Sequence, residues 1–178
     1  MPDLAESDLT PKAWPAEIHG LFSRAGLSQV AYVPDAGHKT LIDLCLEDTA
    51  IRAIPLTTEE EGIALLAGAW LGGAKGALLM QSSGVGNCIN MLSLPANGRF
   101  PLVMLVTMRG EWAEFNPWQV PMARATRPAL ELMGVHCLRV EEPAEVSEVV
   151  SAALDLAYGS EQAVAVLLSQ RLIGRKVW

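Results

Sequence analysis

Three short segments of this 178-residue chain are apolar at nearly every position: GALLMQ (residues 76–81), PLVMLVTM (101–108) and AVAVLL (163–168). A strand with one face in water alternates apolar and polar side chains, so strands without that alternation are buried on both faces. Such strands are typical of a parallel sheet, whose crossover connections place helices on both sides. This feature therefore restricts the chain to an α/β architecture.

The segments between these runs show the helical spacing that crossover connections need. Along the chain, helices are predicted at residues 11–26, 39–48, 58–71, 123–133 and 143–159, and further strands at 29–34, 51–56 and 135–140. The alternation predicts a single α/β domain over residues 1–178, with a mostly parallel sheet and helices on both faces in three layers. Residues 1–12 are polar, and we expect them to form a loose N-terminal segment.

Composition excludes several classes of function. The formal net charge of −7 argues against a nucleic-acid or membrane-surface partner, and no apolar run reaches the roughly 18 residues of a membrane span. The opening MPDLAESDLTPKAW does not resemble a signal peptide, so we expect a cytoplasmic protein. Cys45, Cys88 and Cys137 are interpreted as reduced core residues, and the three histidines lack metal-ligand spacing, so no metal site is predicted on this chain.

One predicted helix begins with three consecutive glutamates, Glu59, Glu60 and Glu61. Acidic residues favour the positive end of the helix dipole, so they fit an ordinary helix start. However, the helix at 58–71 is apolar or small nearly all round, which is typical of a buried helix. Because it follows the strand at 51–56, it begins at the C-terminal edge of the sheet, where open α/β sheets bind ligands. Since consecutive helical residues point about 100° apart, at most two of the carboxylates can face a ligand.

A second feature reaches the same edge of the predicted sheet. The strand at 76–81 leads into SSGVGN (82–87), where Gly84 and Gly86 allow a tight turn and free backbone N–H groups suit an anion or a polar ring. The dinucleotide fingerprint Gly-x-Gly-x-x-Gly fails because position 89 is isoleucine. The glycine turn is weak evidence by itself.

Taken in order, four segments resemble the pyrimidine-binding domain of thiamine diphosphate enzymes, above all the alpha subunit of sulfopyruvate decarboxylase and the related phosphonopyruvate decarboxylases. The segments are AYVPDAGHKTLIDL, TTEEEGIALLAGAWLGG, LLMQSSGVGNCINMLSL, and VTMRGEW followed by QVPMARAT. The resemblance covers about residues 16–168. It implies the pyrimidine-binding fold and thiamine diphosphate as the cofactor.

The resemblance also implies roles for particular residues. The family's glutamate precedes x-Gly, which places it at Glu60; in the family this catalytic carboxylate hydrogen-bonds a ring nitrogen of the cofactor's aminopyrimidine. The glycine-turn residues Ser83, Gly84, Val85 and Asn87 are then expected to bind the same cofactor.

Four residues are candidates for binding the substrate. Asp35 and His38 lie on the loop after the first strand, where the family places polar groups; a plain turn with a helix cap is the alternative. Arg109 follows a buried strand and can pair with a carboxylate, sulfonate or phosphonate, or else form a surface salt bridge. Gln119 belongs to the Gln-x-Pro-Met segment that resembles the family.

The family's diphosphate-binding motif, Gly-Asp-Gly followed by Asn, occurs nowhere in the sequence. The resemblance therefore implies a separate beta subunit that holds the diphosphate through Mg²⁺, and self-association of the chain is expected as well. It implies decarboxylation of a small 2-oxoacid, with sulfopyruvate or a similarly anionic three-carbon compound as first choice. The aromatic loop at 111–118 departs from the family pattern and fits a subunit contact or a lid. A non-catalytic regulatory or binding subunit that retains the fold is the alternative.

Overall fold

The computed structural model describes residues 13–174, so the N-terminal segment expected at residues 1–12 lies outside the described part. Within it, a six-stranded sheet has the order β2-β1-β3-β4-β6-β5, and each neighbouring pair is parallel. The strands are β1 (Leu27–Tyr32), β2 (Arg52–Pro55), β3 (Lys75–Gln81), β4 (Leu102–Thr107), β5 (His136–Val140) and β6 (Ala163–Leu168). The predicted parallel sheet is confirmed.

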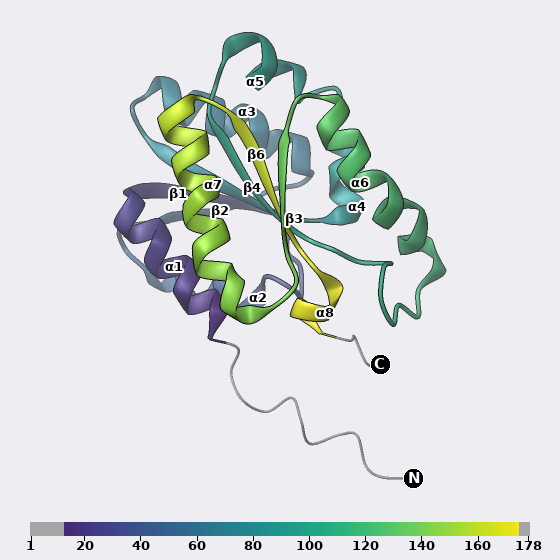
Figure 1. Ribbon diagram of the computed structural model, residues 1–178. Helices are drawn as coiled ribbons and strands as arrows, with labels where there is room; N and C mark the ends of the chain where they lie inside the picture. The colour runs from purple at the N-terminus through teal and green to yellow at the C-terminus, as the bar shows by residue number, and fades with distance from the viewer. Residues whose placement is uncertain (1–12, 175–178) are drawn as a thin grey trace.

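Helices cover both faces of this sheet, which gives the three layers that the sequence predicts (Figure 1). One layer contains α1 (Trp14–Ala25), α2 (Lys39–Glu47) and α7 (Val146–Ser160). The other contains α3 (Glu59–Leu71), α4 (Ser82–Cys88), α5 (Ser93–Gly98) and α6 (Val120–Leu132). Shorter elements are η1 (Pro117–Gln119), η2 (Pro143–Glu145) and α8 (Gln170–Ile173). No helix between residues 13 and 174 is long and apolar enough to span a membrane.

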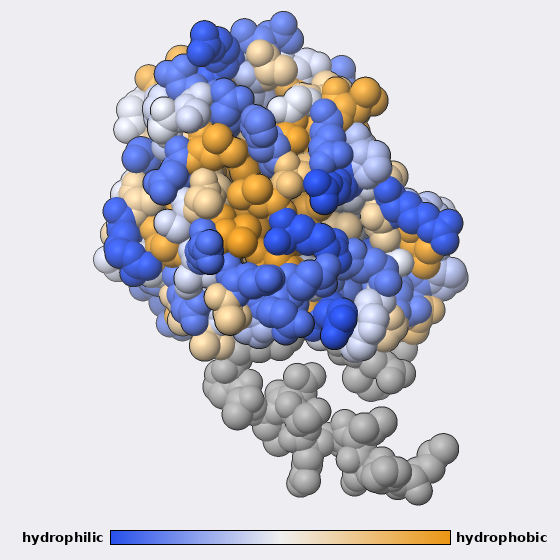
Figure 2. Space-filling model, viewed as in Figure 1, coloured by the Kyte–Doolittle hydropathy of each residue, from blue (hydrophilic) through white to orange (hydrophobic). Residues whose placement is uncertain are grey.

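The three apolar runs form β3, β4 and β6 in the interior of the sheet. Successive residues of β3 enter opposite layers: Leu79 packs with the α1 and α7 side, and Leu78 and Met80 pack with the α3 side. Burial on both faces explains why these strands show no alternation. Figure 2 shows apolar side chains at the surface between α6 and α7, where the edge strand β5 runs in Figure 1.

The prediction that the helix at 58–71 is buried nearly all round is wrong on one side. Ile63 and Leu66 of α3 face the core, whereas Ala64 and Gly68 are exposed and Leu71 is 76% exposed. Only one side of a helix packs against a sheet. Small residues on the opposite side of α3 do not bury that side, because no other element within residues 13–174 covers it there.

At Gly76 the backbone comes very close to its neighbours. A Cβ atom there would lie 2.7 Å from the Gln29 carbonyl oxygen and 2.5 Å from Leu66 Cδ2. We expect Gly76→Ala to lower the free energy of unfolding by about 1–3 kcal/mol, the usual cost of overpacking. The matched control is Gly68→Ala in α3, where nothing lies within 4 Å of the added atom, and it should be neutral or stabilise by up to about 1 kcal/mol. Urea titrations giving the two variants equal stability would contradict this packing argument.

Candidate active site

Four neighbouring strands end at one edge of the sheet, and the predicted site residues follow them. Asp35 and His38 come after β1, Glu60 after β2, α4 after β3, and Arg109 and Gln119 after β4. In the sheet these strands are adjacent in the order β2-β1-β3-β4. Because the strands are parallel, their carboxyl ends meet at the edge where such sheets bind ligands.

The three glutamates at the start of α3 have three different environments. Glu59 is 9% exposed, and its Oε2 accepts a hydrogen bond from Asn87 Nδ2 at 2.8 Å. Glu61 is exposed and accepts a hydrogen bond from the Thr57 backbone N–H at 2.9 Å. Glu60 is half-buried, and its Oε2 is buried without a hydrogen-bond partner. All three glutamates lie in the first turn of α3, as in an ordinary helix start, and Glu61 in addition bonds the chain just before the helix.

The segment SSGVGN forms a helix, α4, so the tight turn predicted from its glycines is wrong. Neither Gly84 nor Gly86 has a positive φ, so neither is needed for an unusual backbone conformation. Gly84 is instead required for space, because a Cβ atom there would lie 2.2 Å from Glu59 Oε1 and 2.5 Å from Glu59 Cγ. The side chain of Glu59 fills that space and brings α3 against α4.

Besides burial, the negative charges of Glu59 and Glu60 both raise the pKa of Cys88, a residue of α4. The pKa of the Cys88 thiol is raised to about 12, first by burial and then by the nearby charges of Glu59 and Glu60. Cys88 is therefore an unreactive core thiol, as the sequence indicated.

Asp35 is the centre of a group of hydrogen-bonded polar residues. Its Oδ2 accepts hydrogen bonds from Thr107 Oγ1 at 2.6 Å and from the Gly37 N–H at 3.2 Å. Its Oδ1 accepts one from Gln81 Nε2 at 3.1 Å, and Gln81 Oε1 accepts one from Ser83 Oγ at 2.9 Å. The group links the ends of β1, β3 and β4 to the first turn of α4. It holds the Asp35 carboxylate in one orientation.

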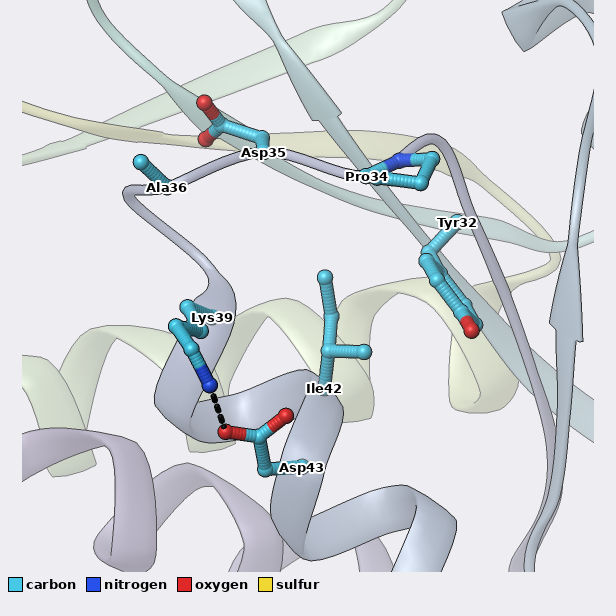
Figure 3. A pocket seen from close by; sticks show the side chains of 7 residues that line it. All are labelled: Tyr32, Pro34, Asp35, Ala36, Lys39, Ile42 and Asp43. Carbon is cyan, nitrogen blue, oxygen red and sulfur yellow. Dashed lines mark hydrogen bonds and ion pairs between the residues drawn. The ribbon is translucent and has the colours of Figure 1, made fainter.

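A pocket of about 410 Å³ lies beside Asp35, between the end of β1 and the start of α2 (Figure 3). Its lining residues are Tyr32, Pro34, Asp35, Ala36, Lys39, Ile42 and Asp43. The ammonium group of Lys39 is paired with Asp43 one helical turn later. The pocket is thus mainly apolar, and its one lining cation is already paired.

His38 is fully buried and does not open into that pocket. Its Nε2 lies 3.0 Å from the Leu105 carbonyl oxygen. Because a carbonyl only accepts, Nε2 carries the proton and Nδ1 is the acceptor, yet Nδ1 is buried without a partner. Burial lowers the pKa of His38, against the opposing effect of Asp35, so the ring is neutral near pH 7. Direct contact of His38 with substrate stays a prediction.

Arg109 has its partner within its own loop. Its Nε and Nη2 each donate a hydrogen bond of 2.7 Å to the Glu114 carboxylate, and the two side chains are 8% and 3% exposed. The hydrogen bond from Arg109 is the main reason that the pKa of Glu114 falls to about 2, and bonds from the Asn116 N–H and Gln170 add to it. This is a buried bidentate pair, not the surface salt bridge considered as the alternative. Contact between Arg109 and substrate stays a prediction.

Three predicted site residues contain buried polar atoms that lack a partner. Within residues 13–174, four buried side-chain nitrogen or oxygen atoms have no hydrogen bond: His38 Nδ1, Glu60 Oε2, Gln119 Oε1 and Trp14 Nε1. Buried polar atoms are normally paired, so each of these four atoms is an exception that needs a reason. No group of three or more His, Cys, Asp or Glu in the described residues is placed to hold a metal ion.

Sequence reasoning missed three residues that organise this edge, Gln81, Thr107 and Glu114, and it gave Glu59 no role of its own. For Gln81 and Thr107 a signal existed, since each is a polar residue ending an otherwise apolar strand. For Glu114 there was no local signal, because its buried position depends on how the loop folds back on Arg109.

The chain is thus a three-layer α/β protein with a candidate ligand site at the carboxyl edge of its parallel sheet. The 2-oxoglutarate:ferredoxin oxidoreductase from Magnetococcus marinus has a similar structure, with a TM-score of 0.69 over 93% of this chain and 15% identity. The chain covers 33% of that protein, and the likeness shows the fold alone. No family model matches the sequence.

The family is identified by the first of two relatives, and the second is similar over a shorter stretch. Sulfopyruvate decarboxylase subunit alpha from Methanothermobacter thermautotrophicus is 39% identical over 145 residues, which are 81% of this chain and 88% of that protein. Phosphonopyruvate decarboxylase from Streptomyces viridochromogenes is 40% identical over 60% of this chain, but the match spans only 28% of that protein. The chain belongs to the family of sulfopyruvate decarboxylase alpha subunits, which confirms the resemblance seen in the sequence.

Proposed function

We propose that this chain is the pyrimidine-binding subunit of a two-subunit, thiamine diphosphate-dependent 2-oxoacid decarboxylase. The observation that carries the proposal is the buried Glu60 Oε2 without a partner. By contrast, Glu59 and Asp35, at the same edge of the sheet, have hydrogen-bonded carboxylates. A ring nitrogen of an aminopyrimidine would complete the hydrogen bonding of Oε2. Membership of the alpha-subunit family supports this assignment.

The residues around Glu60 fit a flat polar ring. The first backbone N–H groups of a helix have no partner within the helix, and α4 begins at this edge. Ser83 Oγ already donates to Gln81 and Asn87 Nδ2 to Glu59, so these two donors are engaged within the chain. Their role, with that of Gly84 and Val85, remains part of the proposal.

The environment of each polar group at this edge suggests a role for it in the proposed reaction. Thiamine diphosphate, when bound, supplies the electron sink for the pair released with CO₂. Glu60 would hold or return a proton at Oε2, the work of a general acid or base. Asp35, held by Thr107 and Gln81, is a fixed acceptor beside the pocket. Gln119 Oε1 is a buried acceptor without a partner, and in this proposal it accepts a hydrogen bond from the substrate.

We further propose that a separate beta subunit holds the diphosphate and Mg²⁺, and that the substrate is sulfopyruvate or a similarly anionic 2-oxoacid. The name "subunit alpha" of the relatives implies another subunit in those proteins. Self-association and a cytoplasmic location belong to the same proposal. The sulfopyruvate choice rests on family membership, since the one cation at the pocket, Lys39, is paired with Asp43.

The two-subunit arrangement predicts weak cofactor binding by this chain alone. In calorimetry, thiamine diphosphate with Mg²⁺ should give no measurable heat with the purified chain. Mixed with a partner that carries Gly-Asp-Gly and a following Asn, the chain should bind the cofactor and release CO₂ from sulfopyruvate. Tight Mg²⁺-dependent binding to the chain alone would rule out the divided site. Cofactor binding with no CO₂ release from a panel of 2-oxoacids would favour the regulatory alternative.

A further inference from the structure

We propose that Glu59 is a positioning residue, whose buried side chain joins α3 to α4 and thereby fixes where Glu60 and the α4 backbone meet a ligand. The inference rests on the proposed function for its link to the cofactor. The contact itself stands on the geometry of the chain alone.

Two independent contacts join Glu59 to α4. Its Oε2 accepts the 2.8 Å hydrogen bond from Asn87 Nδ2. Its Cγ, Cδ and Oε1 occupy the space in which a Cβ atom on Gly84 would lie, at 2.2 to 2.5 Å. One side chain therefore holds α4 at two positions three residues apart, on neighbouring turns of the helix.

The length of α4 makes these contacts decisive for its orientation. A helix of seven residues is not stable by itself, so tertiary contacts must hold it. At its start, Ser82 Oγ accepts a hydrogen bond from the Arg109 N–H at 3.1 Å, and the Ser82 carbonyl accepts one from Thr126 Oγ1 at 3.3 Å. Further along, the polar contact is the one between Asn87 and Glu59. Without it, the side-chain hydrogen bonds that hold α4 within the described residues all lie at its start.

The choice of a carboxylate is itself informative. Among the described residues, Glu59 has no ion-pair partner, although it is only 9% exposed. Burying a carboxylate without a cation is costly, and a plain packing contact between helices would use an apolar side chain. Glu59 also directly precedes Glu60, so the hold on Glu59 fixes the first turn that presents the Glu60 carboxylate. The cost is explained if the orientation of this turn matters for function.

The contact can be measured on the purified chain, with no cofactor or partner. Gly84→Ala should displace the Glu59 side chain and lower Tm by about 5 °C, from overpacking of the size expected in a chain of this length. In the Glu59→Ala background, Gly84→Ala should cause no further fall. Gly86→Ala is the matched control in the same helix, since its added atom meets only Met122 at 3.5 Å or more, and its Tm should stay unchanged or rise. An equal fall for Gly84→Ala in both backgrounds would overturn the contact.

The positioning role is tested in the assembled enzyme. Glu59→Ala should raise KM for thiamine diphosphate about tenfold or more, the scale for a misplaced binding group. Glu59→Gln should stay within about threefold of wild type, because its amide oxygen can still accept from Asn87. A purely structural residue would lower Tm in Glu59→Ala but leave the cofactor KM unchanged, and that result would overturn the inference.

Failure of the inference and failure of the proposed function are distinguishable. If the wild-type assembly binds no thiamine diphosphate, the proposed function fails before any variant is made, and the Tm measurements still decide whether Glu59 holds α4. If wild type binds the cofactor and Glu59→Ala binds it equally well, only the inference fails. If Glu59→Gln is as impaired as Glu59→Ala, Glu59 exchanges a proton with the ligand and is not a positioning residue.

Discussion

Glu60→Gln should lower the activity of the assembled enzyme by about 10² or more, the scale of a lost proton-transfer group. The amide has nearly the shape of the carboxyl group but cannot hold or return a proton. Stability should be unchanged or slightly increased, because the replaced Oε2 is buried without a partner. The measurements are CO₂ release per folded enzyme and Tm of the purified chain.

Glu59→Gln and Glu61→Gln are the matched controls, since each is the same substitution one residue away. Both should retain most of the activity, because Glu59 bonds Asn87 and Glu61 bonds the Thr57 N–H. A fully active Glu60→Gln enzyme would remove Glu60 from catalysis. A loss of about 10² in Glu59→Gln alone would move the catalytic role to Glu59.

The architecture was predictable from the sequence because burial on both faces leaves a local signal. The runs that became β3, β4 and β6 contain few polar residues, and such strands occur in sheets covered on both sides. Helix ends were also close to prediction: α1 ends at Ala25, and Gly26 follows with the left-handed φ of 71° that glycine favours.

Gly84 shows where local reasoning failed. Glycine in a short polar segment usually indicates a turn, so residues 82–87 were predicted as one. In the structure the reason for Gly84 is the side chain of Glu59, which comes from another helix. The sequence could place both residues at the same edge, but it could not show that they touch. Contacts between distant segments depend on tertiary packing, which overrides local preference.

The three glutamates of α3 also show that the sequence alone does not reveal tertiary contacts, here within the candidate site. The helical period indicated that at most two of them can face a ligand, which was as far as geometry without coordinates could go. The structure gives each carboxylate a different environment, and only Glu60 keeps a buried atom without a partner. The family resemblance had selected Glu60 already, and the unpartnered atom supports that choice independently.

Breaking the ion pair between Arg109 and Glu114 should be strongly destabilising. Glu114→Ala leaves the guanidinium group buried without its partner, and removing one member of a buried pair costs about 3–5 kcal/mol. The matched control is Glu131→Ala, which breaks the Arg127–Glu131 pair: its N–O distance is also 2.7 Å, but its side chains are 53% and 47% exposed. That change should cost at most about 1 kcal/mol. Chemical denaturation of both variants checks the difference, and equal costs would mean that the Glu114 pair is solvated in solution.

The Arg109–Glu114 ion pair also determines what we expect Arg109→Met to do to the KM for substrate. Because Nε and Nη2 are both engaged by Glu114, we expect Arg109→Met to disturb the loop that leads to Gln119 and to raise KM by a similar factor for sulfopyruvate and pyruvate. A direct contact with the sulfonate would behave differently, since only the substrate with the second anion would lose a charge-assisted hydrogen bond. That bond contributes about 1.5–3 kcal/mol, or about 10- to 150-fold in KM. A selective rise of this size for sulfopyruvate would show that Arg109 leaves Glu114 to bind the substrate, and unchanged KM values for both compounds would confine Arg109 to the stability of the fold.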